Sequence, residues 1–218
     1  FIGTQNQTRN AVIISPLIGA NTYDGIMIGA GLTNYTLAPA RFQYLLAPMY
    51  GIRSKQWNGA ARLGYTFYPY TNFHTITGSV SAMKFSTNDF ADTAGNKFIT
   101  GFLKITPSVK LVLKENNPKS TRERFIQWKT YFFTEDNLRF RSDTFPNGDR
   151  FTEIKKLQLN RYLNQLKFVA QNTRVLYPYR AELLAEQAKD FVRLAFTGNY
   201  YFNYNDKTGA DVRFFAGK

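Results

Sequence analysis

The sequence predicts an all-β protein, specifically an antiparallel transmembrane β-barrel, from three observations. Residues 192–204 alternate between an apolar or aromatic row and a row of mostly small or polar residues, which is the period-2 signature of a strand with one apolar and one polar face. This run exceeds the roughly 5–6 residues of an average strand and fits the roughly 9–11 residues of a bilayer-spanning one. Aromatic residues make up 17% of the chain, yet mean hydropathy is only −0.36, because barrel strands place apolar residues at alternate positions.

Composition excludes several other classes. No run approaches 18 apolar residues, which excludes a transmembrane helix. The chain has 0 Cys, which removes disulfide scaffolds and cysteine-ligated zinc. The net charge of +13 comes from basic residues dispersed along the chain, whereas nucleic-acid binders concentrate them on one face or in one run. We therefore expect no nucleic-acid partner.

The first half of the chain is predicted to form two hairpins that follow a polar N-terminal segment at 1–10. Residues 11–20 and 25–32 flank the turn-rich NTYD at 21–24, which predicts a first hairpin. Residues 41–52 and 57–67 alternate on either side of a short connection and predict a second. Pro48 lies inside a predicted strand and removes a ladder hydrogen bond, so we expect a bulge or a locally unpaired position there.

The second half continues the same pattern, with longer connections. Residues 86–97 are predicted as a polar loop, and 134–156, which contains Pro146, Asn147 and Gly148, as a long loop outside the cell. Residues 162–171 and 180–187 also fit a helical face, and the strong strand that follows favours strand. Further strands are predicted at 74–85, 99–113, 122–133, 162–171, 180–187 and 210–218.

In total we expect about ten or eleven antiparallel strands in a single segment spanning 1–218. No second domain boundary appears. Residues 212–218 still read as a strand, so we interpret the segment as an incomplete barrel cut from a longer chain, whose signal peptide is removed or lies elsewhere.

The two strand faces define the candidate functional residues. Lysines and arginines on the polar rows cost little free energy when they face a water-filled lumen and much more when they face lipid. The expected lumen-facing basic residues are Lys104, Lys110, Lys129, Lys167, Arg193 and Arg213. The expected lipid-facing and girdle residues are Trp57, Tyr65, Phe67, Val192, Leu194, Phe196, Tyr200, Phe202 and Tyr204, with Tyr35, Tyr68 and Tyr70 as further girdle candidates.

No catalytic, cofactor or metal site is predicted in this segment. The single histidine, His74, opens a strand, while a zinc site needs three or four ligands. Acidic residues gather loosely in the predicted long loop without EF-hand spacing, which favours a solvated loop over calcium binding; they are Glu135, Asp136, Asp143, Asp149 and Glu153. Glu182 and Glu186 share one strand face near Arg180, and we expect structural pairing rather than acid-base catalysis.

Three segments carry a family resemblance: 47–69 (APMYGIRSKQWNGAARLGYTFYP), 177–205 (YPYRAELLAEQAKDFVRLAFTGNYYFNYN) and 211–218 (DVRFFAGK). They resemble the C-terminal outer-membrane barrel attached to M1-type zinc metallopeptidases of some Gram-negative bacteria. The resemblance implies a bacterial outer-membrane location, contact with membrane lipid and lipopolysaccharide, and a zinc-binding H-E-x-x-H helix in a domain upstream of Phe1. This chain has no such motif, so no catalytic residue can be assigned to it.

Three functions remain open at this stage. The first is a membrane anchor or pore of a larger protein, such as one with the upstream peptidase domain that the resemblance implies. The second is a stand-alone porin or surface-antigen-type barrel, which would have the same lipid face without a peptidase. The third is a soluble β-sandwich binding module, which would bury its apolar rows between two sheets.

Overall fold

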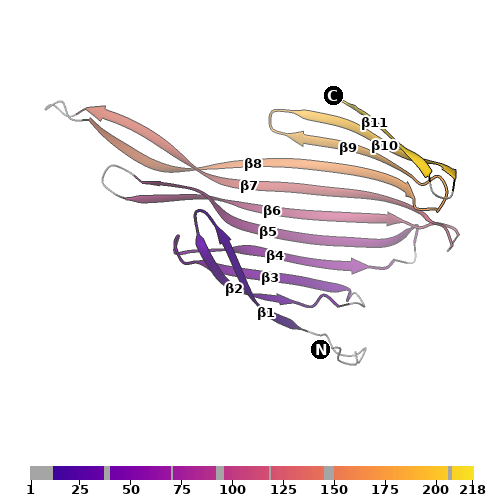
Figure 1. The fold of residues 1–218 in the computed structure, drawn as a ribbon, viewed down its shortest axis with the longest axis horizontal. Coiled ribbons are helices and arrows are strands. Elements are labelled where there is room, and N and C mark those ends of the chain that lie inside the picture. The colour runs from indigo at the N-terminus through magenta and orange to yellow at the C-terminus, as the bar shows by residue number, and fades with distance from the viewer. Residues whose placement is uncertain are drawn as a thin grey trace. The chain divides into compact units, whose positions relative to one another are not determined.

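The computed structural model describes residues 12–36, 40–69, 71–91, 96–117, 119–144, 150–205 and 208–218. The regular elements in these ranges are all strands, and 11 of them form one sheet in which each strand pairs with its neighbours in sequence (Figure 1). No helix that could span a membrane occurs in the described ranges. The strands are β1 (Ile13–Asn21), β2 (Gly25–Thr33), β3 (Phe42–Gly51), β4 (Gln56–Phe67), β5 (Phe73–Ala91), β6 (Lys97–Leu113), β7 (Arg122–Thr144), β8 (Arg150–Asn172), β9 (Tyr179–Ala188), β10 (Val192–Asn205) and β11 (Thr208–Gly217).

This architecture confirms the predicted all-β, antiparallel fold and the predicted number of strands. The strand order begins at β1 and ends at β11. In the described part of the chain these two strands therefore have one neighbour each, and no ladder closes the sheet between them. Closure of this sheet into a barrel stays a prediction.

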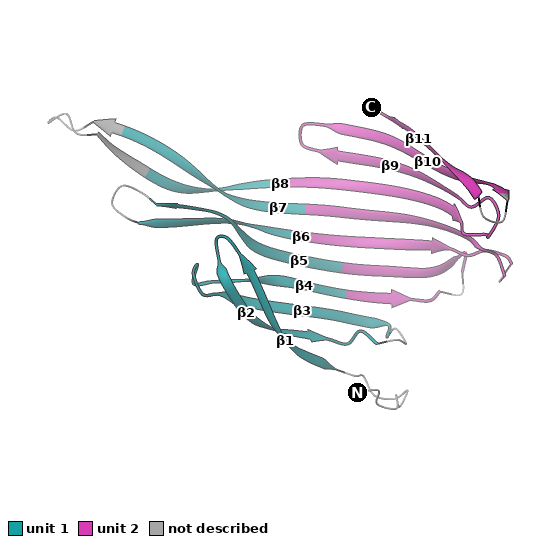
Figure 2. Cartoon of the chain, viewed as in Figure 1, with its two compact units in different colours: residues 1–63, 80–105, 132–161 teal, residues 64–79, 106–131, 162–218 magenta. Residues whose placement is uncertain are grey.

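Contacts divide the chain into two compact units, coloured separately in Figure 2. Unit 1 consists of residues 1–63, 80–105 and 132–161, and unit 2 of residues 64–79, 106–131 and 162–218. Strands β4 to β8 contribute to both units, and we describe each unit by itself.

Unit 1 begins with the predicted first hairpin. Strands β1 and β2 pair from Ile13 opposite Thr33 to Asn21 opposite Gly25. The turn between them buries the Asp24 side chain completely, and its carboxylate accepts hydrogen bonds of 2.7 Å from Asn21 and from Ser86 on β5. A buried carboxylate is tolerated only with such partners, so this turn has a fixed place in unit 1.

Pro48 on β3 interrupts the ladder, as predicted. The β2–β3 register pairs Gly29 with Met49 and resumes at Leu32 opposite Leu46, which skips Pro48. Glycines flank the irregular backbone on both sides: a Cβ on Gly29 would collide with the Pro48 carbonyl oxygen, and one on Gly59 with that of Ala47. The two neighbouring strands therefore approach β3 where a side chain would not fit.

The two predicted loops are wrong over most of their length. Strand β5 continues to Ala91 and β6 starts at Lys97, while β7 continues to Thr144 and β8 starts at Arg150. Cross-strand contacts in unit 1 hold these extensions together, including a 2.9 Å hydrogen bond from Thr134 to Asn160 and an edge-to-face pair of Phe90 and Phe140. These extensions carry few apolar residues, so no sustained alternation of apolar and polar residues could identify them. Pro146, Asn147 and Gly148 lie outside the described residues.

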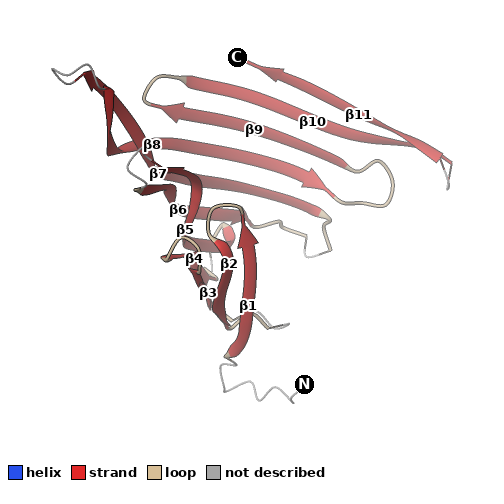
Figure 3. Cartoon of the chain, turned by 60° about the vertical axis from the view of Figure 1, so that its left-hand side comes forward, coloured by secondary structure: helices blue, strands red, loops and turns tan. Residues whose placement is uncertain are grey.

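Unit 2 settles the two ambiguous segments as strands. Residues 162–171 lie in β8 and residues 180–187 form most of β9. Continuous registers join β8 to β9 and β9 to β10, and β10 pairs with β11 with one irregularity between Asn203 and Asn205. Figure 3 shows these four strands side by side. Ladder pairing on both sides of β9 overrides the helix propensity of its alanine, leucine and glutamate residues.

Candidate functional site: a polar and an apolar face in unit 2

The registers of β8 to β11 place unlike residues on the two faces of unit 2. Residues directly opposite in an antiparallel pair point to the same face. Phe168 lies opposite Leu183, which lies opposite Phe196. We call this side the apolar face; its members include Leu166, Phe168, Leu183, Val192, Leu194, Phe196, Tyr200, Phe202, Val212 and Phe214. The opposite side, which we call the polar face, includes Gln165, Lys167, Gln171, Arg180, Glu182, Glu186, Arg193, Thr197, Asn199 and Arg213.

Apolar side chains are exposed on one of these faces and a carboxylate is buried on the other, which is the reverse of the pattern in a water-soluble sheet. On the apolar face Val192 is 78% exposed, Leu194 54% and Phe214 60%. On the polar face Glu186 is 7% exposed, and Val169, between the long polar side chains, is 0% exposed. Apolar area that meets water is unfavourable in proportion to its extent. The apolar face therefore requires a cover that is not water.

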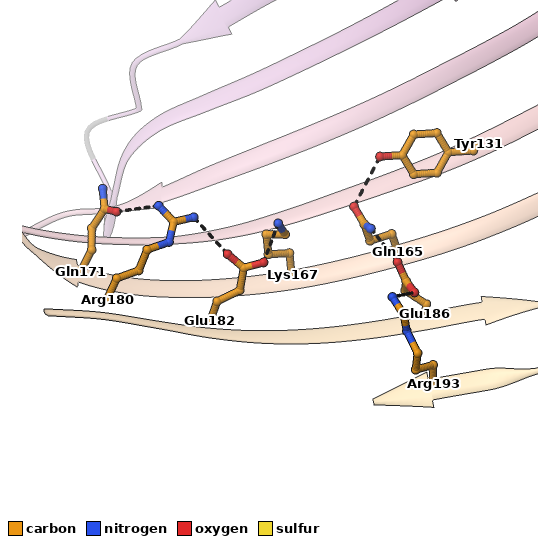
Figure 4. A network of polar contacts seen from close by, with 8 residues as sticks. All are labelled: Tyr131, Gln165, Lys167, Gln171, Arg180, Glu182, Glu186 and Arg193. Atoms are coloured by element: carbon orange, nitrogen blue, oxygen red, sulfur yellow. Dashed lines mark hydrogen bonds and ion pairs between the residues drawn. The ribbon is translucent and has the colours of Figure 1, made fainter. Parts of the chain in front are cut away.

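The polar face carries a first row of contacts that runs across four strands. Its members come from β6, β7, β8 and β9 and are, in order, Lys110, Glu123, Gln171, Arg180, Glu182 and Lys167. Arg180 bridges Gln171 at 3.1 Å and Glu182 at 3.0 Å, and Lys167 reaches the other oxygen of Glu182 at 2.6 Å (Figure 4). Both oxygens of this half-buried carboxylate are paired, which offsets the cost of removing it from water.

A second row crosses β7 to β10. The Tyr131 hydroxyl donates to Gln165 at 3.4 Å, and the Gln165 amide donates to Glu186 at 2.8 Å. Arg193 closes the row with a 2.6 Å ion pair to Glu186 (Figure 4). The two rows join neighbouring strands through side chains in addition to the backbone ladder.

The structure places the predicted basic residues as follows. Lys110, Lys167 and Arg193 belong to the two rows on the polar face, paired with Glu123, Glu182 and Glu186. In unit 1, Lys104 lies over the ring of Phe133 with its Nζ 5.3 Å from the centroid. The remaining two, Lys129 and Arg213, lie on β7 and β11; Lys129 is partly exposed, and Arg213 is exposed opposite Asn199.

Glu123, Gln165 and Gln171 were not singled out from the sequence, although they link the cations. Glu123 could have been found, because it shares a period-2 row with Gln127 and Lys129. The glutamine links could not, since they depend on the register of β8 against its neighbours. Arg180 pairs with Glu182 as the sequence analysis expected.

The predicted lipid-facing and girdle residues are mostly exposed. Trp57 in unit 1 is 64% exposed and packs edge-to-face against Tyr50 at 5.4 Å. In unit 2, Tyr65, Phe67, Phe202 and Tyr204 are exposed. Tyr200 stacks with Tyr177, which the sequence analysis missed, at a centroid distance of 6.4 Å. Tyr70 lies outside the described residues.

The acidic residues and the histidine form no catalytic or metal cluster in the described ranges. Glu135 lies 3.9 Å from Arg161, and Asp136 forms a 2.9 Å ion pair with Lys156. His74 is exposed at the start of β5. The structure does not describe Asp149 or the side chains of Asp143 and Glu153. Among the described residues, no group of three or more histidines, cysteines and carboxylates could hold a metal ion.

The chain was compared with known proteins at three levels. No family model, no curated protein and no solved structure matches it.

Proposed function

We propose that this chain is a membrane-embedded segment of an antiparallel β-barrel in a bacterial outer membrane, where it serves as the anchor or pore of a larger protein. The observation that carries the proposal is the reversed exposure in unit 2. Apolar residues such as Leu183, Val192 and Leu194 are exposed, whereas Glu186 and Val169 on the opposite face are buried. A lipid bilayer supplies the apolar cover, and a lumen filled by water or by protein accommodates the polar rows.

Backbone pairing supports the same proposal. A bilayer offers no hydrogen-bond partner to a free N–H or C=O group, so spanning strands must satisfy their backbone within a ladder. Strands β2 to β10 each have a neighbour on both sides. Strand β10 has 14 residues, enough for the roughly 9–11 tilted residues that cross the hydrocarbon core.

A β-sandwich accounts less well for the same faces. In a sandwich the apolar rows of two sheets interdigitate about 10 Å apart and become the core. Here Leu166, Leu183 and Leu194 occupy the apolar rows, and each is about half exposed. The large buried hydrophobic residues expected between two sheets are therefore missing from this face in the described part of unit 2.

The choice between a peptidase-linked and a stand-alone barrel rests on the family resemblance alone. An H-E-x-x-H helix encoded upstream of Phe1 would favour the peptidase-linked protein. A reading frame that opens with a signal peptide just before Phe1 would favour a porin or surface-antigen barrel.

Adjacent leucines on β9 offer a matched test of the two faces. Leu183 lies on the apolar face opposite Phe168, and Leu184 lies on the polar face opposite Lys167. Because the chain has 0 Cys, Leu183→Cys and Leu184→Cys each introduce a unique thiol. Maleimide reacts with the thiolate, which an apolar environment disfavours. In phosphatidylcholine vesicles, a water-soluble maleimide should therefore label Leu183→Cys more slowly than Leu184→Cys, and both should react equally in urea. If a water-soluble maleimide labels Leu183→Cys in vesicles as fast as in urea, its face is not in lipid.

A further inference from the structure

The turn between β8 and β9 in unit 2 exposes apolar residues at its tip. Val175 is 90% exposed, Leu176 56% and Tyr177 40%. Tyr177 continues this apolar surface onto the strands, since its ring stacks with Tyr200, which in turn contacts Phe202 at 4.5 Å. The tip therefore extends the apolar face beyond the end of the strands.

Hydrogen bonds hold this turn in place. The Tyr177 backbone, at φ 56°, donates its N–H to Asn203 at 2.8 Å and accepts from Arg174 Nε at 2.9 Å. The Arg174 N–H donates to Asn172 at 3.1 Å. Val175 and Leu176 are thus presented outward by a turn whose base is fixed.

Cationic side chains surround the tip. The β6–β7 turn lies beside it, because the Thr173 N–H donates to the Thr121 carbonyl at 3.1 Å; Figure 2 shows both turns at one end of unit 2. Across the described residues 114–117, 119–124 and 172–178, two acids, Glu115 and Glu123, accompany five exposed cations: Lys114, Lys119, Arg122, Arg124 and Arg174. Glu115 pairs with Arg124 at 2.7 Å, and Glu123 pairs with Lys110 outside these turns. The excess charge is positive.

We propose that this end of unit 2, residues 114–124 and 172–178 as described, binds the phosphate headgroups of anionic phospholipid. The inference rests on the proposed membrane function. It specifies which end of the sheet meets the headgroups, which class of lipid binds there and which residues bind it. Val175, Leu176 and Tyr177 enter the boundary between headgroups and acyl chains, where apolar and aromatic residues are favourable. The cations lie at phosphate depth, where each basic residue gains from an anionic surface.

The test uses energy transfer from a dye on Asn116→Cys, an exposed polar position of the β6–β7 turn. The labelled protein is reconstituted in phosphatidylcholine vesicles containing tracer phosphatidylglycerol or tracer phosphatidylcholine with the acceptor dye on an acyl chain. We expect transfer to the phosphatidylglycerol tracer to be greater by about twofold, and this preference to fall in high salt. The double change Arg122→Gln/Arg174→Gln should abolish the preference. The control Arg213→Gln removes one positive charge from the polar face of β11 and should preserve the preference.

Equal transfer to both tracers in the unmodified sequence, or a preference that survives Arg122→Gln/Arg174→Gln, overturns the inference; a protein partner would then be the better occupant of the tip. Quenching of Trp128 by acyl-chain bromines, measured in the Trp57→Phe variant so that Trp128 is the one tryptophan, separates this failure from that of the proposed function. Trp128 is 55% exposed and lies outside both turns. If it is quenched while the tracers are equal, the membrane proposal stands and only the headgroup inference falls; if it is not quenched, both fall.

Discussion

Glu186 shows how this sheet accommodates charge at a covered position. Its side chain is 8% accessible, yet it accepts from Gln165 on one neighbouring strand and pairs with Arg193 on the other. A buried carboxylate without partners would cost several kcal/mol. The pairing therefore stabilises the order β8–β9–β10 as well as the side chain itself.

Replacing Arg193 should expose this dependence. Arg193→Met leaves Glu186 with Gln165 as a partner and without its cation, and we expect a loss of about 1–3 kcal/mol in the free energy of unfolding. The measurement is urea unfolding from lipid vesicles. Arg213→Met, at an exposed position, should change stability by less than about 0.5 kcal/mol, and equal losses in the two variants would contradict the account.

Two glycines provide a matched comparison of backbone requirements. Gly59 has φ 140° and faces the Ala47 carbonyl, so Gly59→Ala should destabilise by at least about 1–3 kcal/mol. Gly78 has no heavy atom within 4 Å of an added Cβ, and Gly78→Ala should be neutral or stabilising by up to about 1 kcal/mol. Unfolding midpoints measure both, and a tolerated Gly59→Ala would refute the close approach beside Pro48.

Asp24 predicts a defined pH dependence in unit 1. Burial raises the pKa of Asp24, but hydrogen bonds from Ser54, Ser86 and Asn21 outweigh it and hold the pKa below its ordinary value of 3.8. The charged form is therefore the stabilising one. Its contribution is complete above the ordinary value and is lost as the pH falls through the lower folded-state pKa.

Asp24→Asn should accordingly be less stable than the unmodified sequence at pH 7, by about 1–3 kcal/mol. The difference between the two should shrink as the pH falls below 3.8. Unfolding free energies measured at several pH values check this, and a difference that grows on acidification would show that the neutral carboxyl is the preferred form.

At the scale of strands, the sequence predicted elements wherever one row was apolar. The hairpin of β1 and β2 and the long strand β10 follow this rule. The parts of β5 at residues 86–91 and of β7 at residues 134–144 do not, because they carry few apolar residues and cross-strand contacts hold them. The alternation of apolar and polar residues assigns the two faces of a strand, but it does not detect a strand that lacks a sustained apolar row.

Lysine substitution on β9 tests the assignment of faces at this scale. Leu183→Lys puts a charge on the apolar face, where a lysine at the bilayer midplane costs about 2–4 kcal/mol. Leu184→Lys puts it on the polar face near Glu182 and Glu186 and should cost clearly less. Folding free energies in vesicles provide the comparison, and an equal or reversed order would argue against lipid on the Leu183 side.

At the scale of the whole molecule, the sequence was sufficient for the all-β, antiparallel sheet and for the division into apolar and polar rows, because period-2 patterning encodes both. The partners of the cations were not predictable, because Glu123 with Lys110 and Gln165 with Glu186 depend on register between strands. The surface at Val175 and Leu176 was also missed, since a short turn carries no periodic signal. The central claim is that lipid covers the apolar rows.

The two tryptophans of the chain test that claim most directly, since Trp57 is 64% and Trp128 55% exposed. We would reconstitute the protein, and the Trp57→Phe variant that leaves Trp128 alone, in vesicles with bromine on the acyl chains. The account predicts strong quenching by bromine and little by aqueous iodide. Strong iodide quenching with no effect of bromine would place the tryptophans in water and contradict a membrane-embedded sheet.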